Sequence, residues 1–416
     1  PENLNLLGTI NFKGNFTGYP SDFVAYGKFR TELGEVNTDR LMKENERGLV
    51  EYKGKISSDQ FELGTLFDQE DLGTLGLNVK VNGIGFTKKT ASVFAEGAIK
   101  FIEYKDYRYT DIKVDGSFNQ EQFVGKLKVN DENLISDFTG TINVNERTPV
   151  SQFQLTVQKA KLAKLNLFNQ KDTSTTLRFS STVDIRGKDI DNFSGRATIE
   201  DISYKDQKLD HRIDNLNLIA NREGGKRNLE LFSSFLDAQM LGKYKLKDLV
   251  GLYYSYVNNF FPDESYESKF SENQAFIIEA KLKNTKPLTE VLLPDLKVDS
   301  GLAIKASFNS ENYFSDIVLN GERVRYKESD VRDFKLNIDS ENDSVQVLFT
   351  SGSLSVNGSQ KFVDLSIDSD IENLTNHNLI KWRYFGDKIG SGYLKLENKI
   401  ESFYKMDFSF IDSYFF

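Results

Sequence analysis

The chain has 416 residues, 38% of them hydrophobic, and its 53 basic and 62 acidic side chains give a net charge of −9. This hydrophobic content is typical of folded proteins, and the acidic balance argues against a nucleic-acid groove. The sequence has no cysteine, which excludes thiolate catalysis, cysteine-based zinc sites, iron–sulfur clusters and disulfides. It has no apolar run of about 18 residues or more, so it predicts no membrane-spanning helix.

Apolar residues recur at every second position over most of the chain, which is the pattern of half-buried β-strands. The clearest stretch, residues 112–144, predicts three strands separated by polar turns at 119–122 and 130–133. The same alternation returns at 177–185, 216–220, 229–233, 336–338, 345–349, 354–356 and 363–367. The 33 Phe and 18 Tyr, beside only 6 Pro, favour the same strand-rich fold. A strand and its turn together take about 12–15 residues, which predicts on the order of 30 strands.

Five dipeptides predict tight hairpin turns, because such turns need backbone angles with positive φ. They are Asn82-Gly83, Asp115-Gly116, Gly224-Gly225, Asn320-Gly321 and Asn357-Gly358.

A second group of glycines shares the register of the apolar residues inside the expected strands. These glycines are Gly125, Gly140, Gly187, Gly195 and Gly242. Glycine inside a strand usually marks sharp curvature or the close approach of another backbone. The group therefore favours a sheet that is bent into a U.

Each expected strand is apolar on one side and polar on the other, so its apolar side must be covered. A sandwich, a closed barrel and a sheet folded over on itself all meet this requirement, and periodicity does not choose among them. Together with the glycines, the pattern leads us to expect an all-β fold. Its form would be one elongated, strongly curved antiparallel sheet over residues 1–416, a groove with an apolar interior and a few short helices.

Four segments interrupt the β pattern, at 60–75, 160–168, 247–261 and 288–293. The strongest is an amphipathic helix at 247–261, in which Leu249, Leu252, Tyr253, Tyr256 and Phe260 share one face, Val250, Val257 and Phe261 widen it, and Pro262 ends it. We expect this helix to plug or flank the β core, and contact with lipid or a partner is the alternative.

The sequence offers little that would support catalysis. His211 and His377 are its only imidazoles, and neither has a metal-ligand partner nearby. No phosphate-binding glycine loop and no nucleophile elbow occurs. Most carboxylates fall in turns or on the polar side of strands. We therefore expect no enzyme activity, no cofactor and no metal site.

Several segments resemble the TamB branch of the AsmA-like proteins, in the form found in Bacteroidota. The first is Asn11-Phe-Lys-Gly-Asn-Phe-Thr-Gly18, which is followed by Phe23-Val-Ala-Tyr-Gly-Lys-Phe29. Further similar segments lie at 61–64, 71–73, 79–83, 85–86, 229–244, 282–289 and 294–296. The likeness covers most of the chain from about residue 5 onward, and it rests on the order of diffuse motifs rather than on a catalytic signature.

The resemblance implies a periplasmic all-β trough that bridges the inner and outer membranes and moves phospholipid or assists outer-membrane biogenesis. It also implies an outer-membrane partner of the Omp85 (TamA-like) type. The family's N-terminal inner-membrane anchor and its C-terminal partner-binding portion have no counterpart here. We therefore expect an internal piece of a longer chain.

Alternate apolar side chains on a curved sheet would form a continuous nonpolar lane for phospholipid acyl chains. The residues expected to contact lipid are Val114, Phe118, Phe123, Leu127, Val129, Leu134, Phe138, Ile142, Val144, Leu177, Phe179, Val183, Ile185, Leu229, Leu231, Val345, Val347 and Phe349.

Two other functions remain open from the sequence. In a structural or adhesive β-sandwich array, opposed sheets would fill each other's apolar faces and leave no lumen for lipid. In a sugar-binding or carbohydrate-active solenoid, aromatic platforms would be expected, and the single Trp382 argues mildly against it.

Overall fold

The computed structural model describes residues 7–415, apart from 20–21, 47, 86–89, 120, 144–148, 168–173, 208–209, 263–269, 287–288, 291–292, 300, 359, 386–388 and 403–404. The chain forms 25 strands that belong to one antiparallel sheet. This confirms the all-β antiparallel fold with a few short helices. The strand number is below the expected 30 because many strands reach 13 or 14 residues. The chain divides into two compact units, described separately below.

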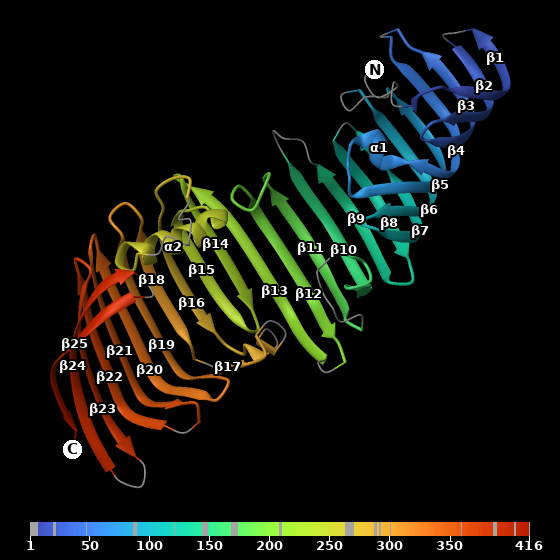
Figure 1. Cartoon of the computed structure of the whole chain (residues 1–416). Helices are drawn as coiled ribbons and strands as arrows, with labels where there is room; N and C mark the ends of the chain where they lie inside the picture. The colour runs from blue at the N-terminus through green and yellow to red at the C-terminus, as the bar shows by residue number, and fades with distance from the viewer. Residues whose placement is uncertain are drawn as a thin grey trace. The chain divides into compact units, whose positions relative to one another are not determined.

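Unit 1 comprises Pro1–Lys188 and Ala197–Arg212. Its short helix α1 spans Leu63–Phe67. Its strands, blue to green in Figure 1, are β1 (Asn11–Tyr19), β2 (Asp22–Thr31), β3 (Gly34–Glu44), β4 (Val50–Glu62), β5 (Leu72–Ile84), β6 (Ser92–Tyr104), β7 (Tyr107–Asn119), β8 (Gln122–Asn130), β9 (Leu134–Asn143), β10 (Val150–Lys161), β11 (Thr176–Arg186) and most of β12 (Ser194–Lys205).

Unit 2 comprises Asp189–Arg196 and Ile213–Phe416. A 3₁₀ turn, η2 (Leu246–Asp248), leads directly into α2 (Leu249–Phe260), the helix expected at 247–261. The strands, green to red in Figure 1, are most of β13 (Asp210–Glu223), β14 (Lys226–Ser233), β15 (Leu236–Lys243), β16 (Ala275–Leu282), β17 (Leu296–Val298), β18 (Ala303–Asn309), β19 (Phe314–Tyr326), β20 (Ser329–Glu341), β21 (Ser344–Val356), β22 (Gln360–Glu372), β23 (Thr375–Phe385), β24 (Ile389–Ser402) and β25 (Lys405–Phe415).

Strand pairing follows the chain. From β1 to β11, each strand pairs antiparallel with the next one. In unit 2 the same rule holds except at β17, which pairs with β19 while β16 pairs with β18. Because antiparallel partners lie directly opposite each other, residues of one parity form continuous rows across many strands. These rows define the two faces of the sheet.

Two of the five predicted turns are confirmed and three are wrong. Gly224-Gly225 and Asn357-Gly358 connect strands and have positive φ. Asn82-Gly83 lies inside β5, Asp115-Gly116 inside β7 and Asn320-Gly321 inside β19. These three dipeptides resemble turns in composition, but their glycines fill crowded face positions. A Cβ at Gly321, for example, would lie 2.7 Å from the Phe334 ring.

The prediction of close backbone approach holds for Gly125, Gly140 and Gly242. A Cβ on Gly125 would lie 2.5 Å from the Asp115 carbonyl oxygen, and one on Gly140 would lie 2.3 Å from that of Gln152. Gly242 has φ +148 and similar crowding by the Ala275 carbonyl. Gly187 differs from the prediction, since β11 ends at Arg186 and places Gly187 in a connection.

Candidate functional site: an uncharged face in unit 1

The most distinctive surface of unit 1 is one face of β4–β11, here called the unit 1 face. It consists of four rows of residues that pair across these eight strands. The rows are Tyr52, Gly83, Val93, Phe118, Phe123, Ile142, Ser151, Ile185; Gly54, Val81, Ala95, Gly116, Gly125, Gly140, Phe153, Val183; Ile56, Val79, Gly97, Val114, Leu127, Phe138, Leu155, Ser181; and Ser58, Leu77, Ile99, Ile112, Val129, Ser136, Val157, Phe179. None of these described positions carries a charge.

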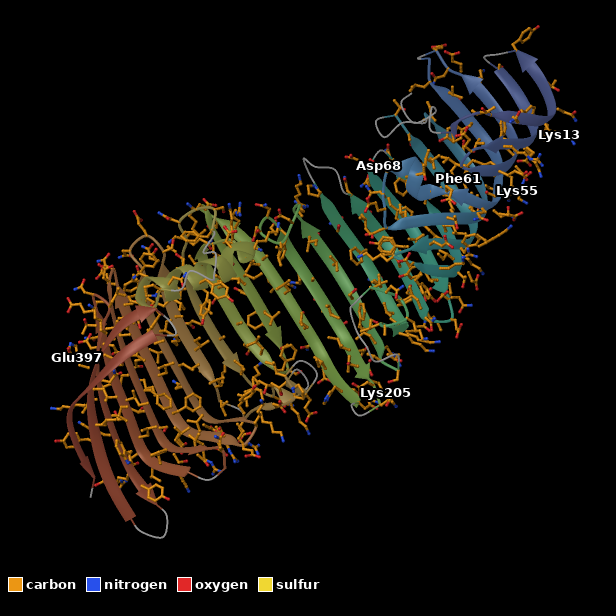
Figure 2. All side chains as sticks on the ribbon, viewed as in Figure 1. Lys13, Lys55, Phe61, Asp68, Lys205 and Glu397 are labelled. Atoms are coloured by element: carbon orange, nitrogen blue, oxygen red, sulfur yellow. The ribbon has the colours of Figure 1, made fainter. Side chains whose placement is uncertain are left out.

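The opposite face of the same strands is charged. One of its rows runs Lys55, Lys80, Glu96, Asp115, Lys126, Thr139, Gln154 and Thr182 across β4–β11. These side chains are exposed, and Lys55 is labelled in Figure 2. Successive side chains of a strand point to opposite faces of the sheet. The residues that alternate with these exposed ones therefore lie together on the uncharged face.

The second row of the unit 1 face is built of small residues over much of its length. Gly54, Ala95, Gly116, Gly125 and Gly140 lie in this row. Larger apolar side chains flank it on both sides, and four phenylalanines step across β7–β10 beside the glycines. Their ring centroids are 5.8 Å apart for Phe118–Phe123, 6.1 Å for Phe123–Phe138 and 5.3 Å for Phe138–Phe153.

The two ends of the strands in this face differ in how they are covered. At one end the turn at 162–167 folds over the sheet, and Leu165 is fully buried among Tyr109, Ile112 and Val157. Tyr109 donates a hydrogen bond to the Leu165 carbonyl oxygen at 3.2 Å. At the other end Phe118 is 55% exposed. The face is therefore closed where Leu165 covers it and exposed at Phe118, while Tyr52, in the same row as Phe118, is buried in a second cluster with Val79 and Val81.

A carboxylate at the closed margin stiffens the turn between β8 and β9. Asp131 Oδ2 accepts hydrogen bonds from the Thr110 backbone N–H at 3.0 Å and its hydroxyl at 2.7 Å, and Oδ1 accepts one from the Asn133 N–H at 2.8 Å. Burial alone would raise the pKa of Asp131, but hydrogen bonds from Tyr107, Asn133 and Thr110 outweigh it and hold the pKa below its ordinary value.

Most residues expected to contact lipid lie on this face. The four rows include Val114, Phe118, Phe123, Leu127, Val129, Phe138, Ile142, Phe179, Val183 and Ile185. Leu134 and Leu177 pack against the buried cluster at the closed margin. Val144 lies outside the described residues.

The other expected residues lie on one face of unit 2, here called the unit 2 face. Leu229 and Val347 belong to one of its rows, Leu231 and Phe349 to the next, and Val345 to a third. This third row is not uniformly apolar. It runs Arg227, Gly242, Phe276, Phe308, Ser315, Ser340, Val345, Ile371, Asn376 and Asn398.

Several polar members of the unit 2 face are hydrogen-bonded to one another. Ser315 Oγ lies 2.8 Å from Ser340 Oγ. Further along, Asn378 donates to Asn398 Oδ1 at 2.9 Å, and Ser369 Oγ lies 2.9 Å from Asn378 Oδ1. Such a network is stable only where its members find partners. Sequence patterns do not indicate this network, because isolated serines and asparagines do not reveal which strands will bring them together.

The helix α2 covers part of the unit 2 face. Its Tyr256 hydroxyl lies 2.8 Å from Ser315 Oγ and 3.0 Å from Ser340 Oγ. Phe260, 2% exposed, packs in a cluster with Val345, Ile371 and Ile400. The helix thus lies on the β core, as expected, and buries apolar rows together with the serine pair. Two residues differ from the prediction: Tyr253 and Val250 were expected on the core face of the helix, but they are 62% and 65% exposed.

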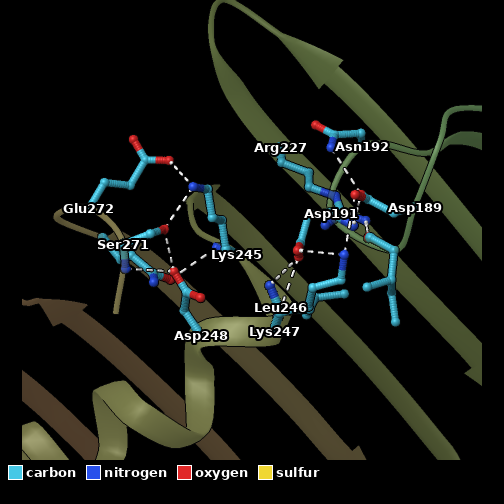
Figure 3. Close-up of polar contacts among 12 residues, drawn as sticks. Asp189, Asp191, Asn192, Arg227, Lys245, Leu246, Lys247, Asp248, Ser271 and Glu272 are labelled. Carbon is cyan, nitrogen blue, oxygen red and sulfur yellow. Dashed lines mark hydrogen bonds and ion pairs between the residues drawn. The ribbon is translucent and has the colours of Figure 1, made fainter. Parts of the chain in front are cut away.

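A polar cluster holds the start of α2 in place (Figure 3). Asp191 Oδ1 accepts a hydrogen bond from the Leu246 N–H at 2.6 Å, and Asp248 Oδ2 accepts one from the Ser271 N–H at 2.9 Å. Lys245 Nζ lies 3.0 Å from Glu272 Oε1, and this hydrogen bond raises the pKa of Lys245. The cluster lines a pocket of about 470 Å³. Its lysines pair with carboxylates, and Arg227 donates a hydrogen bond to the Ile190 carbonyl oxygen, so the cluster anchors the start of the helix.

Two features are missing from the part of the chain that is described. Within it, no group of three or more histidines or carboxylates is placed to hold a metal ion. No described helix combines the length and apolar character that a membrane crossing requires. Comparison with known proteins gives no assignment: no family model, no curated protein and no solved structure matches this chain.

Proposed function

We propose that this protein shelters phospholipid acyl chains on the unit 1 face and so conducts phospholipid or assists outer-membrane biogenesis. The observation that carries the proposal is the uncharged face itself, four rows deep across β4–β11. A charge inside a nonpolar lane would raise a barrier of several kcal/mol for a sliding acyl chain. A face without charges presents no such barrier.

The size of the unit 1 face suits an acyl chain. Eight strands at a spacing of about 4.8 Å extend the rows over about 34 Å. One leaflet of a bilayer has a hydrocarbon depth of about 15 Å, half of the full core. Each CH₂ group that moves from water onto such a surface gains about 0.8 kcal/mol when fully buried. Binding of this kind needs no specific pocket and no catalytic residue.

We further propose that the sheet curves around this lane as a trough with its opening at the Phe118 margin. Support comes from the glycines of the second row, whose Cα atoms approach neighbouring backbones closely enough to exclude a Cβ. Phe118, at the open margin, would then lie nearest to the lipid head groups, which remain in water.

The wider setting follows the resemblance to the TamB branch. We propose a periplasmic protein without enzymatic activity or cofactor, held at the inner membrane by a segment outside this sequence. An outer-membrane protein of the Omp85 type would be its partner. A structural or adhesive array is the alternative, in which the uncharged face packs against protein instead of lipid.

The test compares adjacent residues of opposite parity on β8. A photo-crosslinking amino acid is placed at Leu127, on the unit 1 face, or at Lys126, on the charged face. The chain is then irradiated with vesicles of phosphatidylethanolamine and phosphatidylglycerol. We expect phospholipid adducts at Leu127 and few at Lys126, as read by mass spectrometry. Equal labelling at both positions, or protein adducts alone at Leu127, would favour the structural array.

A further inference from the structure

The pocket at the start of α2 contains two arginines that lie opposite each other on neighbouring strands of unit 2. Arg222 on β13 pairs directly with Arg227 on β14, and both line the pocket of about 470 Å³. Directly opposed residues of an antiparallel pair lie close together, and like charges in such a pair are unfavourable. The fold therefore keeps a pair of positive charges that lowers its own stability.

The carboxylates of the pocket do not neutralise these two arginines. They pair with the lysines instead: Lys245 Nζ lies 3.0 Å from Glu272 Oε1, and Lys247 Nζ lies 3.2 Å from Asp189 Oδ2 (Figure 3). Within the described part of the chain, neither arginine forms an ion pair with a carboxylate. The positive charge that is left over in the pocket is therefore that of the two guanidinium groups.

The guanidinium of Arg227 is fixed in the wall of the pocket. It is 2% exposed and lies over the rings of Phe193 and Tyr244, at 5.0 Å and 5.4 Å from their centroids. Its Nη2 donates a hydrogen bond to the Ile190 carbonyl oxygen at 2.6 Å, whereas Nε and Nη1 are buried without a hydrogen-bond partner among the described residues. Because little water screens a buried charge, its field is strong in the neighbouring space. Arg227 thus favours an anion in the pocket.

Arg222 supplies hydrogen-bond donors that a ligand can reach. Its side chain is exposed, and its Nη2 donates one long hydrogen bond of 3.3 Å to the Asp191 carbonyl oxygen. A guanidinium carries five N–H donors in a planar fork, which matches the oxygens of a phosphate group. A phosphate also has acceptor oxygens that point in several directions, so one group can face both arginines. The chemistry of the pair therefore suits a phosphate group.

We propose that this pocket binds a phosphate group, carried either by a small soluble phosphate or by a phospholipid head group. Arg222 contacts the phosphate oxygens, and Arg227 contributes its charge from the pocket wall. The bound group neutralises the like-charged pair, so that binding stabilises unit 2. This site goes beyond the proposed function, because it lies on a different surface and would stand even if the unit 1 face bound no lipid.

The first experiment titrates the full chain with inorganic phosphate in a calorimeter at constant ionic strength. We expect Arg222→Gln to weaken binding about tenfold or more, the effect of losing a hydrogen bond to a charged group. Lys226→Gln is the matched control, because Lys226 is exposed on β14 and does not line the pocket. It removes one positive charge and should bind phosphate within about twofold of the unmodified chain.

Thermal unfolding in phosphate and in chloride gives a second readout of the same variants. Phosphate stabilises many proteins because it is excluded from their surface, so only the difference between variants is informative. In chloride, Arg222→Gln should melt no lower than the unmodified chain, because the substitution relieves the like-charged pair. In phosphate, the unmodified chain and Lys226→Gln should gain more in Tm than Arg222→Gln does.

Two further probes separate the possible sources of the phosphate group. If it comes from a lipid head group, phosphatidylglycerol vesicles should retain less of Arg222→Gln than of the unmodified chain or Lys226→Gln. If it comes from a soluble compound, glycerol phosphate should bind more weakly to Arg222→Gln while vesicle retention is equal for all three chains. Either result supports the site. The proposal is overturned if inorganic phosphate does not bind the unmodified chain, or binds Arg222→Gln equally well.

Discussion

The unit 1 face and the unit 2 face share the same strand alternation, yet they differ in charge and in what covers them. In unit 1, uncharged residues pair across eight strands, Leu165 caps one margin, and Tyr52, Val79 and Val81 form a second buried cluster. In unit 2, one row carries buried Arg227, Ser315, Ser340 and Asn398, and α2 lies on part of it. The same alternation is therefore compatible with an uncharged face and with a face that holds buried polar groups beneath a helix.

The largest expected difference is between removing the ring of Phe260, on the helix α2 that lies over the unit 2 face, and removing the ring of Phe123 on the unit 1 face. Phe260→Ala should destabilise unit 2 by about 3–5 kcal/mol, because this buried ring leaves a cavity under α2. Phe123→Ala should cost only about 1–2 kcal/mol, because the ring is half-buried on the unit 1 face. Urea unfolding followed by circular dichroism measures both. Trp382 packs against Phe362 at 6.4 Å, so its fluorescence reports on unit 2. Similar losses for both variants would contradict the view that Phe260 is buried beneath a cover while Phe123 is only half-buried.

The second row of the unit 1 face, which is rich in glycine, offers a second comparison. Gly140→Ala should cost about 3 kcal/mol or more, because its Cβ would meet the Gln152 carbonyl oxygen at 2.3 Å where φ is +149. Gly224→Ala is the matched control in a unit 2 turn, where nothing lies within 4 Å and only the φ of +56 opposes a side chain. That control should lose about 1–2 kcal/mol. Melting temperatures of the two variants decide the point, and an equal loss would mean that close backbone packing is not what requires Gly140.

A third prediction concerns acid sensitivity of unit 1. Glu103 accepts hydrogen bonds from the Thr74 hydroxyl at 2.7 Å and the Thr74 N–H at 3.0 Å, which together with Arg108 lower its pKa from 4.5 to about 2. A carboxyl with a lowered folded-state pKa stabilises the fold above its unfolded pKa, and this contribution is lost as the pH falls from about 4.5 towards 2.

Glu103→Gln should therefore reduce stability by about 1–2 kcal/mol at pH 7, and the difference from the unmodified chain should shrink below about pH 4.5. Glu96→Gln, on the charged outward row, removes the same charge without those contacts and serves as the control. Denaturation curves at pH 7 and pH 3 suffice. A deficit in Glu103→Gln that persists unchanged at pH 3 would speak against the role of its ionised form.

The smallest expected effect on stability comes from removing single serine hydroxyls on the unit 2 face, one without a hydrogen-bond partner and one with partners. Ser351 is buried and its hydroxyl has no hydrogen-bond partner among the described residues, so Ser351→Ala should be neutral or stabilise unit 2 by up to about 1 kcal/mol. Ser340→Ala should instead lose about 1–2 kcal/mol, because its hydroxyl bonds Tyr256 and the Tyr313 carbonyl oxygen. Trp382 fluorescence during urea unfolding resolves the two. A loss at Ser351 equal to that at Ser340 would refute the distinction.

The fold was predictable where a residue's neighbours along the chain determine its environment. Alternation placed Phe123, Leu127 and Phe138 on one face, and β pairing puts Leu127 opposite Phe138 in the third row, two rows away from Phe123. The same local evidence misassigned Asp115-Gly116 as a turn, because the need for glycine there comes from Gly125 on the next strand. Composition around a glycine does not distinguish a positive φ from a crowded Cα.

The helix cover was predictable only in part. The 3.6-residue pattern located α2, but its partners Ser315 and Ser340 lie 59 and 84 residues after Tyr256. Nothing in local periodicity selects a serine at that separation. The buried asparagines of β23 and β24 could not be predicted either, because each is stable in the core only when it is hydrogen-bonded to other polar residues there.

Sequential antiparallel pairing has a consequence for how the length of such a protein can change. Inserting a single strand would reverse the direction of every later strand, whereas inserting a hairpin of two strands restores both direction and facing. Each inserted hairpin would lengthen the rows by about 9.6 Å, two strand spacings, without altering the neighbours it joins. Length in this architecture is therefore adjustable in steps of a whole hairpin. The inserted strands would continue each uncharged row with residues that point to the same face of the sheet.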